Sequence, residues 1–537
     1  MDYARHVQTH ETPQSEPIPG STQVPNSAGG YAWAVSKWDR LDRFLVLGTE
    51  GGTYYVGERQ LTRENADAII ACLAEDTART VTRIAEISEA GRAPRNDPAV
   101  FALALAYAEG NAEARRFALA NLPRVCRIGT HLFHFVKFIE TLRPAGPKGG
   151  GKGPGRWGRA LRRAVAAWYQ TAAPRVAYQA VKYVQRDGWS HKDLVILSHP
   201  KPLTAAHGAL YDWIVNGKRA GECPPIIQAV EALRVAVEAK EVTRLIREYR
   251  LPREAVETAS TEWLKRPEVW EALLEEMPLE AMVRNLGVMT ARGLVAPMAD
   301  ATAYVLKRLS DAEAIRGTRL HPIKLLAALL TYQNGSSRGG REWTPVGPIV
   351  DALDSAFYLA FPNVETTGKR WLYALDISGS MATGEVAGVK GLTPRIASAA
   401  MALVLAATEP QHCFVAFQTE LTPLTISPSW RLDTACEKIS RLPMGGTDCA
   451  LPMLYAAKHE IPIDCFVVLT DSETWAGSIH PVQALRKYRA VLVPTAKLIV
   501  VGMTANGFTI ADPADAGMLD VVGFDTATPE LMTQFAR

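Results

Sequence analysis

The hydrophobic pattern of this chain changes once, near Gly368, and that change constrains the fold more than any other feature. Before it, apolar residues recur at three- and four-residue spacing, as in 61–74, 131–141 and 157–170, which is typical of amphipathic helices. After it, apolar runs of strand length alternate with helical stretches. The first part predicts antiparallel helix pairs stacked as degenerate HEAT-like repeats. The second predicts a doubly wound α/β domain whose parallel sheet is covered on both faces.

A chain of 537 residues is too long for a single hydrophobic core. We expect a mobile tail over residues 1–30, because this segment has four prolines and few apolar residues. A helical-repeat domain over 31–367 and an α/β domain over 368–537 follow. The strands of the second domain are expected at 371–377, 412–417, 464–470 and 496–503.

The formal charge of the whole chain is only +3, yet the charge is unevenly distributed. Residues 115–202 carry 17 lysines and arginines against three acids, a net charge of +14. Residues 371–537 carry 11 basic and 16 acidic residues, a net charge of −5. A nearly neutral chain therefore contains one strongly basic region, which favours a polyanionic partner.

Seven scattered cysteines without a C-x-x-C pair favour reduced thiols in the cytoplasm. The first residues lack an apolar segment, and the chain has no apolar run of about 18 residues. We therefore expect a cytoplasmic protein without an export signal or a membrane partner.

Oxygen-bearing side chains follow three elements of the predicted α/β domain. Asp376, Ser378 and Ser380 form a D-x-S-x-S loop after the first strand, Thr447 lies in a glycine-rich loop before a helix, and Asp471 follows another strand. Ligands of doubly wound sheets bind beyond the carboxyl ends of the strands, so these five side chains are expected to converge there. Two carboxylates and three hydroxyls are hard donors that suit a divalent cation, Mg²⁺ rather than zinc.

These loops, in this order, resemble the metal-ion-dependent adhesion site of von Willebrand factor A domains. The resemblance implies a binding module in which an acidic group of a partner completes the coordination of the metal. A hydrolytic metal site would normally add a general base, often with a second metal. Asp448 and Glu473 are the only spare acids nearby in the sequence, which makes hydrolysis the weaker alternative.

The segment 143–163 is basic and rich in glycine. It imitates a P-loop but lacks the hydroxyl after the lysine and follows a helix instead of a strand, so that interpretation fails. A basic loop that leads into a basic helix favours a binding site for RNA or another polyanion over a basic face that contacts only solvent. Trp157 is then either a platform on which a base stacks or a residue of the core. The candidate RNA contacts are Arg127, Lys137, Lys148, Lys152, Arg156, Arg159, Arg162, Arg163, His191 and Lys192.

His191 and Lys192 are included because Ser190 is a good N-cap, which would place both residues in the first turn of a helix, where a phosphate can bind. A capped helix with an exposed histidine explains the same residues without a ligand.

Several longer motifs are together similar to the Ro 60-kDa autoantigen family, also called the TROVE-domain family. They include Gly51-Gly52-Thr53-Tyr54-Tyr55, Val125-Cys126-Arg127-Ile128, Trp157-Gly158-Arg159-Ala160-Leu161-Arg162, GWSHKDL at 188–194, Gly445-Gly446-Thr447-Asp448-Cys449 and NGFTIADP at 506–513. The glycine- and lysine-rich loop 143–155 departs from the family pattern.

The resemblance implies a noncatalytic, monomeric, ring-shaped RNA-binding protein of a bacterial cytoplasm. Such a ring would bind small noncoding Y RNA on its outer basic face and single-stranded ends of misfolded RNA in its hole. It would be tethered through RNA to a 3′ exoribonuclease similar to polynucleotide phosphorylase. A Mg²⁺-dependent phosphodiesterase and a metal-dependent protein-adhesion module remain as alternatives. The ring is expected to close where residues 31–44 meet the region just before the A domain.

Overall fold

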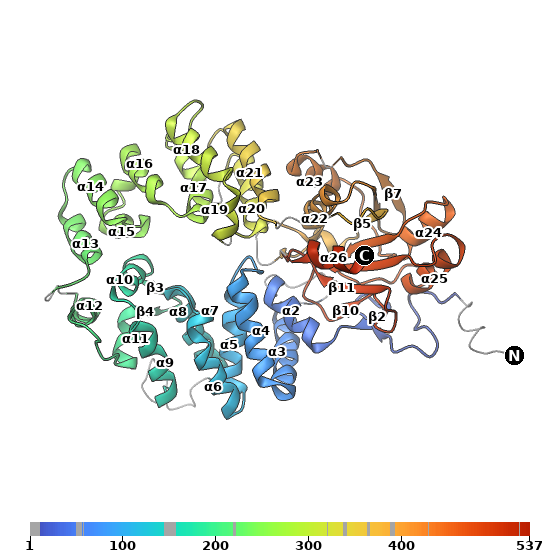
Figure 1. Ribbon diagram of the computed structural model, residues 1–537, viewed down its shortest axis with the longest axis horizontal. Coiled ribbons are helices and arrows are strands. Elements are labelled where there is room, and N and C mark those ends of the chain that lie inside the picture. The colour runs from blue at the N-terminus through green and yellow to red at the C-terminus, as the bar shows by residue number, and fades with distance from the viewer. Residues whose placement is uncertain are drawn as a thin grey trace.

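The computed structural model describes residues 11–49, 56, 58–143, 157–217, 222–318, 320–336, 341–361, 366–386, 392–427, 429–525 and 527–537. Figure 1 shows an arc of helices whose two ends approach an α/β domain, so that the whole forms a ring. No helix among the described residues is both long and apolar enough to cross a bilayer. The seven cysteines are all free thiols.

The helical part confirms the prediction of stacked, mostly antiparallel helices, and the expected segments 61–74, 131–141 and 157–170 fall on three of them. Some of the helices have side-chain N-caps; Asp76, for example, accepts from the Arg79 amide at the start of α4. The helices are α2 (Lys37–Leu47), α3 (Glu58–Glu75), α4 (Thr77–Ala90), α5 (Asp97–Glu109), α6 (Ala112–Ala120), α7 (Leu122–Val125), α8 (Gly129–Leu142), α9 (Arg159–Tyr169), α10 (Ala173–Lys182), α11 (His191–Ser198), α12 (Ala205–Asn216), α13 (Pro225–Val235), α14 (Ala239–Tyr249), α15 (Arg253–Ala259), α16 (Pro267–Glu276), α17 (Leu279–Ala291), α18 (Asp300–Leu309), α19 (Ala312–Gly317), α20 (Pro322–Gln333) and α21 (Gly347–Leu359).

Two short additions interrupt the helices. A hairpin of β3 (Gln185–Arg186) and β4 (Trp189–Ser190) precedes α11, and a single 3₁₀ turn (Trp263–Lys265) precedes α16. Ser190 caps α11 as expected, in a reciprocal capping box with Asp193.

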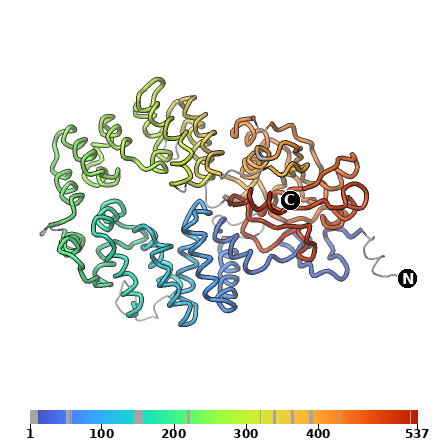
Figure 2. Tube along the Cα trace, in the orientation of Figure 1, coloured from blue at the N-terminus to red at the C-terminus, as the bar shows by residue number. Residues whose placement is uncertain are grey.

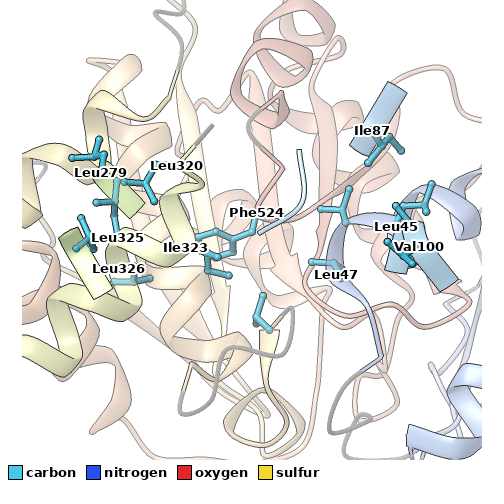
Figure 3. Close-up of a cluster of buried hydrophobic side chains, with 14 of the residues drawn as sticks. Leu45, Leu47, Ile87, Val100, Leu279, Leu320, Ile323, Leu325, Leu326 and Phe524 are labelled. Carbon is cyan, nitrogen blue, oxygen red and sulfur yellow. The ribbon is translucent and has the colours of Figure 1, made fainter. Parts of the chain in front are cut away.

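Several contacts close the ring, and one of them joins α20 to the residues after α4. The Nε2 atom of His321, at the start of α20, lies 2.9 Å from the carbonyl oxygen of Arg92, which follows α4. The guanidinium of Arg92 also binds the carboxylate of Asp525 in the α/β domain, with Nε 2.9 Å from Oδ2. Phe524 packs beside Ile323 in the same place (Figure 3). The ring is therefore closed as expected. The contacts differ from the expected ones, because residues 31–44 meet the A domain itself, through Arg43 and Asp520, and His321 of α20 meets Arg92.

The α/β domain has a six-stranded sheet of order β11-β9-β8-β5-β6-β7. The expected strands are β5 (Trp371–Asp376), β6 (His412–Phe417), β8 (Cys465–Thr470) and β9 (Lys497–Gly502). β11 (Met518–Val522) extends the parallel sheet beside β9, whereas β7 (Leu421–Leu424) runs antiparallel to β6 at the edge. Within the six described strands of this sheet, the prediction of parallel pairing is wrong only for β7.

Side-chain alternation along the strands gives the sheet two apolar faces, as a doubly wound fold requires. Leu372 and Phe466 point to the face that is covered by α24 (Leu451–Lys458) and α25 (Pro481–Val491). Tyr373 and Val467 point to the other face, where α22 (Pro394–Thr408) packs. The remaining helices of the domain are α23 (Leu432–Ser440) and α26 (Thr528–Ala536), and a 3₁₀ turn (Ser380–Ala382) follows β5.

The expectation of a mobile tail is wrong for residues 11–30, which pack along the α/β domain (Figure 2). β1 (Val24–Pro25) pairs with β2 (Tyr31–Ala34), which pairs with β10 (Phe508–Thr509). The side-chain amide of Gln14 is completely buried and donates to Asp448 Oδ1 at 2.7 Å and to the Ile479 carbonyl at 2.8 Å. Polar side chains thus anchor residues 11–30. The segment therefore lacks the apolar pattern from which an ordered segment would be predicted. Residues 1–10 lie outside the described part.

Candidate metal centre and basic surface

Three loops meet at the carboxyl edge of the sheet. β5 and β8 are adjacent parallel strands, so Asp376 at the end of one and Asp471 just after the other lie at the same edge. The Gly379 amide donates to the Gly445 carbonyl at 3.2 Å, and the Trp475 amide donates to the Thr447 carbonyl at 3.0 Å. These bonds connect the glycine-rich loop to both strand ends. The expected convergence of the loops is therefore present.

The five predicted ligand side chains are buried: Asp376, Ser378, Ser380, Thr447 and Asp471. Asp376 accepts from the Ser378 amide at 2.9 Å and from the Thr470 hydroxyl at 2.6 Å. The hydroxyl oxygens of Ser378 and Ser380 are 3.1 Å apart. The D-x-S-x-S loop thus folds back on its own carboxylate, and this explains why short polar residues alternate there.

Two buried carboxylates in one place are electrostatically costly. Burial and the neighbouring Asp471 raise the pKa of Asp376 to about 7. Burial also raises the pKa of Asp471, and a hydrogen bond from Ser380 partly offsets that rise. The hydroxyl of Thr447 is buried without a hydrogen-bond partner among the described residues. A divalent cation would relieve both defects, because it neutralises paired carboxylates and accepts a hydroxyl oxygen as a ligand.

The five predicted ligands offer only oxygen donors. No group of three or more histidine, cysteine, aspartate and glutamate side chains in the described part of the chain is arranged to hold a metal. The candidate site offers two carboxylates and three hydroxyls, the donor chemistry that Mg²⁺ prefers. The residues present fit such an ion.

The two spare acids are engaged in structure. Asp448 accepts from the Ala450 amide at 3.0 Å and from Gln14. Glu473 accepts from the amides of Ser27 and Ala28 at 2.9 and 3.2 Å, and burial together with Asp471 raises its pKa to about 8. Both carboxylates thus hold the N-terminal segment in place.

Two residues that support these loops are not among the predicted ligands. Thr470 directly precedes the predicted ligand Asp471, so its position was a usable signal. Asn506 was quoted only as part of a family motif; it is buried and donates to the Asp471 carbonyl at 2.6 Å. Nothing in local spacing connects residue 506 with residue 471.

Several predicted RNA contacts lie on neighbouring helices at the outer side of the ring. Arg159 and Arg163 are exposed on α9, and Lys192 is exposed on α11, which packs against α9. α6, with the exposed Arg115 and Arg116, packs on α9 as well (Figure 1). We refer to these five exposed residues of the packed helices α6, α9 and α11, residues 115, 116, 159, 163 and 192, as the basic surface.

Other predicted contacts are placed less favourably. Arg127 is half-buried and donates to the Arg124 carbonyl and the Ser88 hydroxyl, which ties it to the fold. Lys137 on α8 pairs with Glu140 at 3.0 Å. Arg162 is half-buried on α9. Lys148, Lys152 and Arg156 lie outside the described residues.

One predicted contact, His191, is corrected, and one open alternative, the role of Trp157, is decided. The His191 ring is buried, with Nδ1 2.8 Å from the Tyr169 hydroxyl, and burial lowers its pKa to about 4. A neutral buried imidazole is unsuited to phosphate. Trp157 is buried as well and packs against Trp189, so it is core and not a stacking platform. The sequence alone could not decide the burial of either residue, because burial depends on which elements pack beside it.

The fold and the loops together define a class: a ring of helical repeats closed by a von Willebrand factor A-type domain. Family models for the TROVE domain match residues 24–218 and 249–336, and the model for the Ro60 vWA domain matches residues 370–536. The chain belongs to the TROVE-domain, or Ro 60-kDa, family.

Its relatives cover nearly the whole chain. It is 42% identical over 540 residues to RNA-binding protein RO60 of Deinococcus radiodurans, covering 99% of this chain and 98% of that protein. It is 34% identical to RNA-binding protein RO60 of Caenorhabditis elegans, covering 96% and 90%. The crystal structure of the Deinococcus radiodurans Ro protein matches with a TM-score of 0.68 and 42% identity, covering 94% of this chain and 99% of that one.

Proposed function

We propose that this protein is a noncatalytic RNA-binding ring whose main electrostatic contact is the basic surface. The observation that carries the proposal is the exposure of arginines on the adjacent helices α6 and α9 in a chain whose relatives are named RNA-binding proteins. Arg159 and Arg163 are one helical turn apart and form no ion pair with a described residue, so both are available to phosphates.

The cellular role we propose follows the family resemblance. The ligands are small noncoding Y RNA and single-stranded ends of misfolded RNA, in RNA quality control or ribonucleoprotein assembly. A 3′ exoribonuclease similar to polynucleotide phosphorylase would be tethered through RNA to the monomeric ring in the cytoplasm. Support comes from the ring shape and from the full-length likeness to the two relatives.

Replacing Arg159 and Arg163 together by alanine is expected to weaken binding of a structured RNA with a single-stranded 3′ tail. Each lost contact with a single strand should flatten the slope of log affinity against log salt by about 0.7, because fewer counterions are released. Filter binding at several salt concentrations measures both quantities.

The matched control replaces Arg244 and Arg253, which lie on α14 and α15 and pair with Glu248 and Glu257. This control removes the same charge outside the basic surface and should leave the slope unchanged. Equal slopes for the two double variants would show that the basic surface is not the RNA site.

We further propose that Asp376, Ser378, Ser380, Thr447 and Asp471 bind a divalent cation, Mg²⁺. The orphan hydroxyl of Thr447 and the paired buried carboxylates support this. When bound, the ion would supply the positive charge that these carboxylates lack.

Replacing Asp376 by asparagine is expected to abolish Mg²⁺ binding in isothermal titration calorimetry, and Thr447→Ala should weaken it. RNA affinity of the Asp376→Asn variant should equal that of the parent, since the basic surface is made by other helices. The alternative of a phosphodiesterase would be supported instead if the parent cleaved RNA with Mg²⁺ and the variant did not.

A further inference from the structure

The metal loops face the helical half of the chain across a narrow space. A cavity that reaches Ser380 and Thr504 is lined on its other side by Leu47 and Thr49, at the end of α2, and by Leu61 of α3. Its water-accessible volume is about 20 Å³, and one water molecule needs about 10–15 Å³ of such volume. Between these described residues the space next to Ser380 is about the size of one water molecule.

A chain of hydrogen bonds connects the same loops to α2. The side-chain amide of Asn506 donates to the Asp471 carbonyl at 2.6 Å and accepts from Arg43 Nη1 at 3.2 Å. Arg43 lies on α2 and is fully buried. Beside it, the Asn65 side chain of α3 donates to the Ala505 carbonyl at 3.3 Å. Any displacement of Asp471 therefore reaches the first helices of the ring through two bonds.

The N-terminal segment holds the other side of the Asp471 loop. The Glu473 amide donates to Asp471 Oδ1 at 3.1 Å, while its carboxylate accepts from the Ser27 and Ala28 amides. Asn26 donates to the Thr474 carbonyl at 2.8 Å. A Cβ atom at Gly30 would overlap that carbonyl, so the segment needs glycine there to lie so close.

We propose that the metal centre is an internal fastening: a bound divalent cation stabilises the docking of α2, α3 and residues 11–30 on the A domain, and so the closed ring. The cation binds best when the Asp376 and Asp471 loops are correctly placed relative to each other. α2, α3 and residues 11–30 hold the Asp471 loop in that place from outside the domain. Linkage then requires that docking strengthen cation binding and that the cation strengthen docking by the same factor. This inference rests on the proposed binding of the cation.

The test uses hydrogen–deuterium exchange of the full chain with Mg²⁺ or with EDTA, beside calorimetry. In the parent, Mg²⁺ should slow amide exchange in residues 11–30 and 37–47 by roughly 5-fold or more, the lower end of coupling between linked sites. Asp376→Asn should remove the effect. Asp300→Asn, the same chemical change at an exposed position on α18, should behave as the parent does.

Asn506→Ala separates the coupling from the binding. It keeps the five cation ligands but removes the side chain that bridges the Asp471 carbonyl and Arg43. The effect of Mg²⁺ on exchange in 37–47 should therefore shrink while calorimetry still detects the ion. If this variant does not fold, the comparison of parent and Asp376→Asn decides the matter.

Binding of Mg²⁺ to the parent without any change of exchange in either segment would overturn the fastening and leave the cation site intact. No Mg²⁺ binding to the parent would overturn the site itself, and the fastening with it.

Discussion

Replacing Arg43 by methionine is expected to lower the free energy of unfolding by about 3–5 kcal/mol, the usual effect of removing one partner of a buried ion pair. Arg43 Nη2 lies 2.6 and 2.7 Å from the two carboxylate oxygens of Asp520. Burial raises the pKa of Asp520, and Arg43 works against that rise. Without the arginine, Asp520 remains as an uncompensated charge at the junction of the two halves. Urea unfolding followed by tryptophan fluorescence measures the loss.

Two controls distinguish the ion pair from general damage. Adding Asp520→Leu to the Arg43 variant should recover much of the loss, because an apolar pair of similar size often replaces a buried ion pair without cost. Arg247→Ala, which breaks an exposed pair with Glu275, should cost less than about 1 kcal/mol. A loss of less than about 1 kcal/mol for the single Arg43 variant would contradict the importance of the junction.

Acidification is expected to destabilise the helical half strongly, because burial lowers the pKa of three of its described histidines, His131, His191 and His321. Burial lowers the pKa of His321 to about 3 and that of His191 to about 4, against an ordinary value of about 6.5. Between these values the unfolded chain binds more protons than the folded one, so stability is complete above about pH 6.5 and falls as the pH decreases. At about pH 4.5 each histidine should cost roughly 2–3 kcal/mol.

His321 also closes the ring. Its Nδ1 atom accepts from the Ile323 amide at 3.2 Å, so Nε2 carries the proton that it donates to the Arg92 carbonyl. A second proton, on Nδ1, would abolish the Ile323 bond and place a charge beside Phe524. Protonation of His321 at low pH is therefore expected to open the contact between α20 and Arg92.

The comparison of urea midpoints at about pH 7 and pH 4.5 tests this expectation. His321→Gln cannot titrate and still offers a donor to Arg92, so its midpoint should depend less on pH than that of the parent. His459→Gln, at an exposed position of the A domain, should leave the pH dependence unchanged. An identical pH dependence in the parent and the His321 variant would contradict the assignment.

The features that the sequence could predict are those encoded within one element or one loop. β5 is buried over its whole length, from Trp371 to Asp376, so its apolar run is unambiguous, and the alternation of Asp376, Ser378 and Ser380 identifies the loop after it. The capping box at Ser190 is likewise local. In each case the residues that determine the structure are adjacent in the chain.

The features that could not be predicted depend on distant neighbours. Whether Trp157 faces solvent or Trp189, and whether His191 meets a phosphate or Tyr169, depends on how helices stack. Residues 11–30 look disordered because their partners, such as Ile479, come hundreds of positions later. The closing contact of His321 with Arg92 follows from the curvature of the whole arc.

The ion pair between Arg43 and Asp520 has a consequence for how the protein is made, because 477 positions separate its members. A ribosome adding about 5–20 residues per second needs roughly 24–95 s to travel that distance. During this interval the Arg43 guanidinium lacks the Asp520 carboxylate, and the surface of the nascent helices around it lacks its partner in the A domain. The ring can only be joined after the last strand has left the exit tunnel, so its assembly is necessarily one of the final events of synthesis.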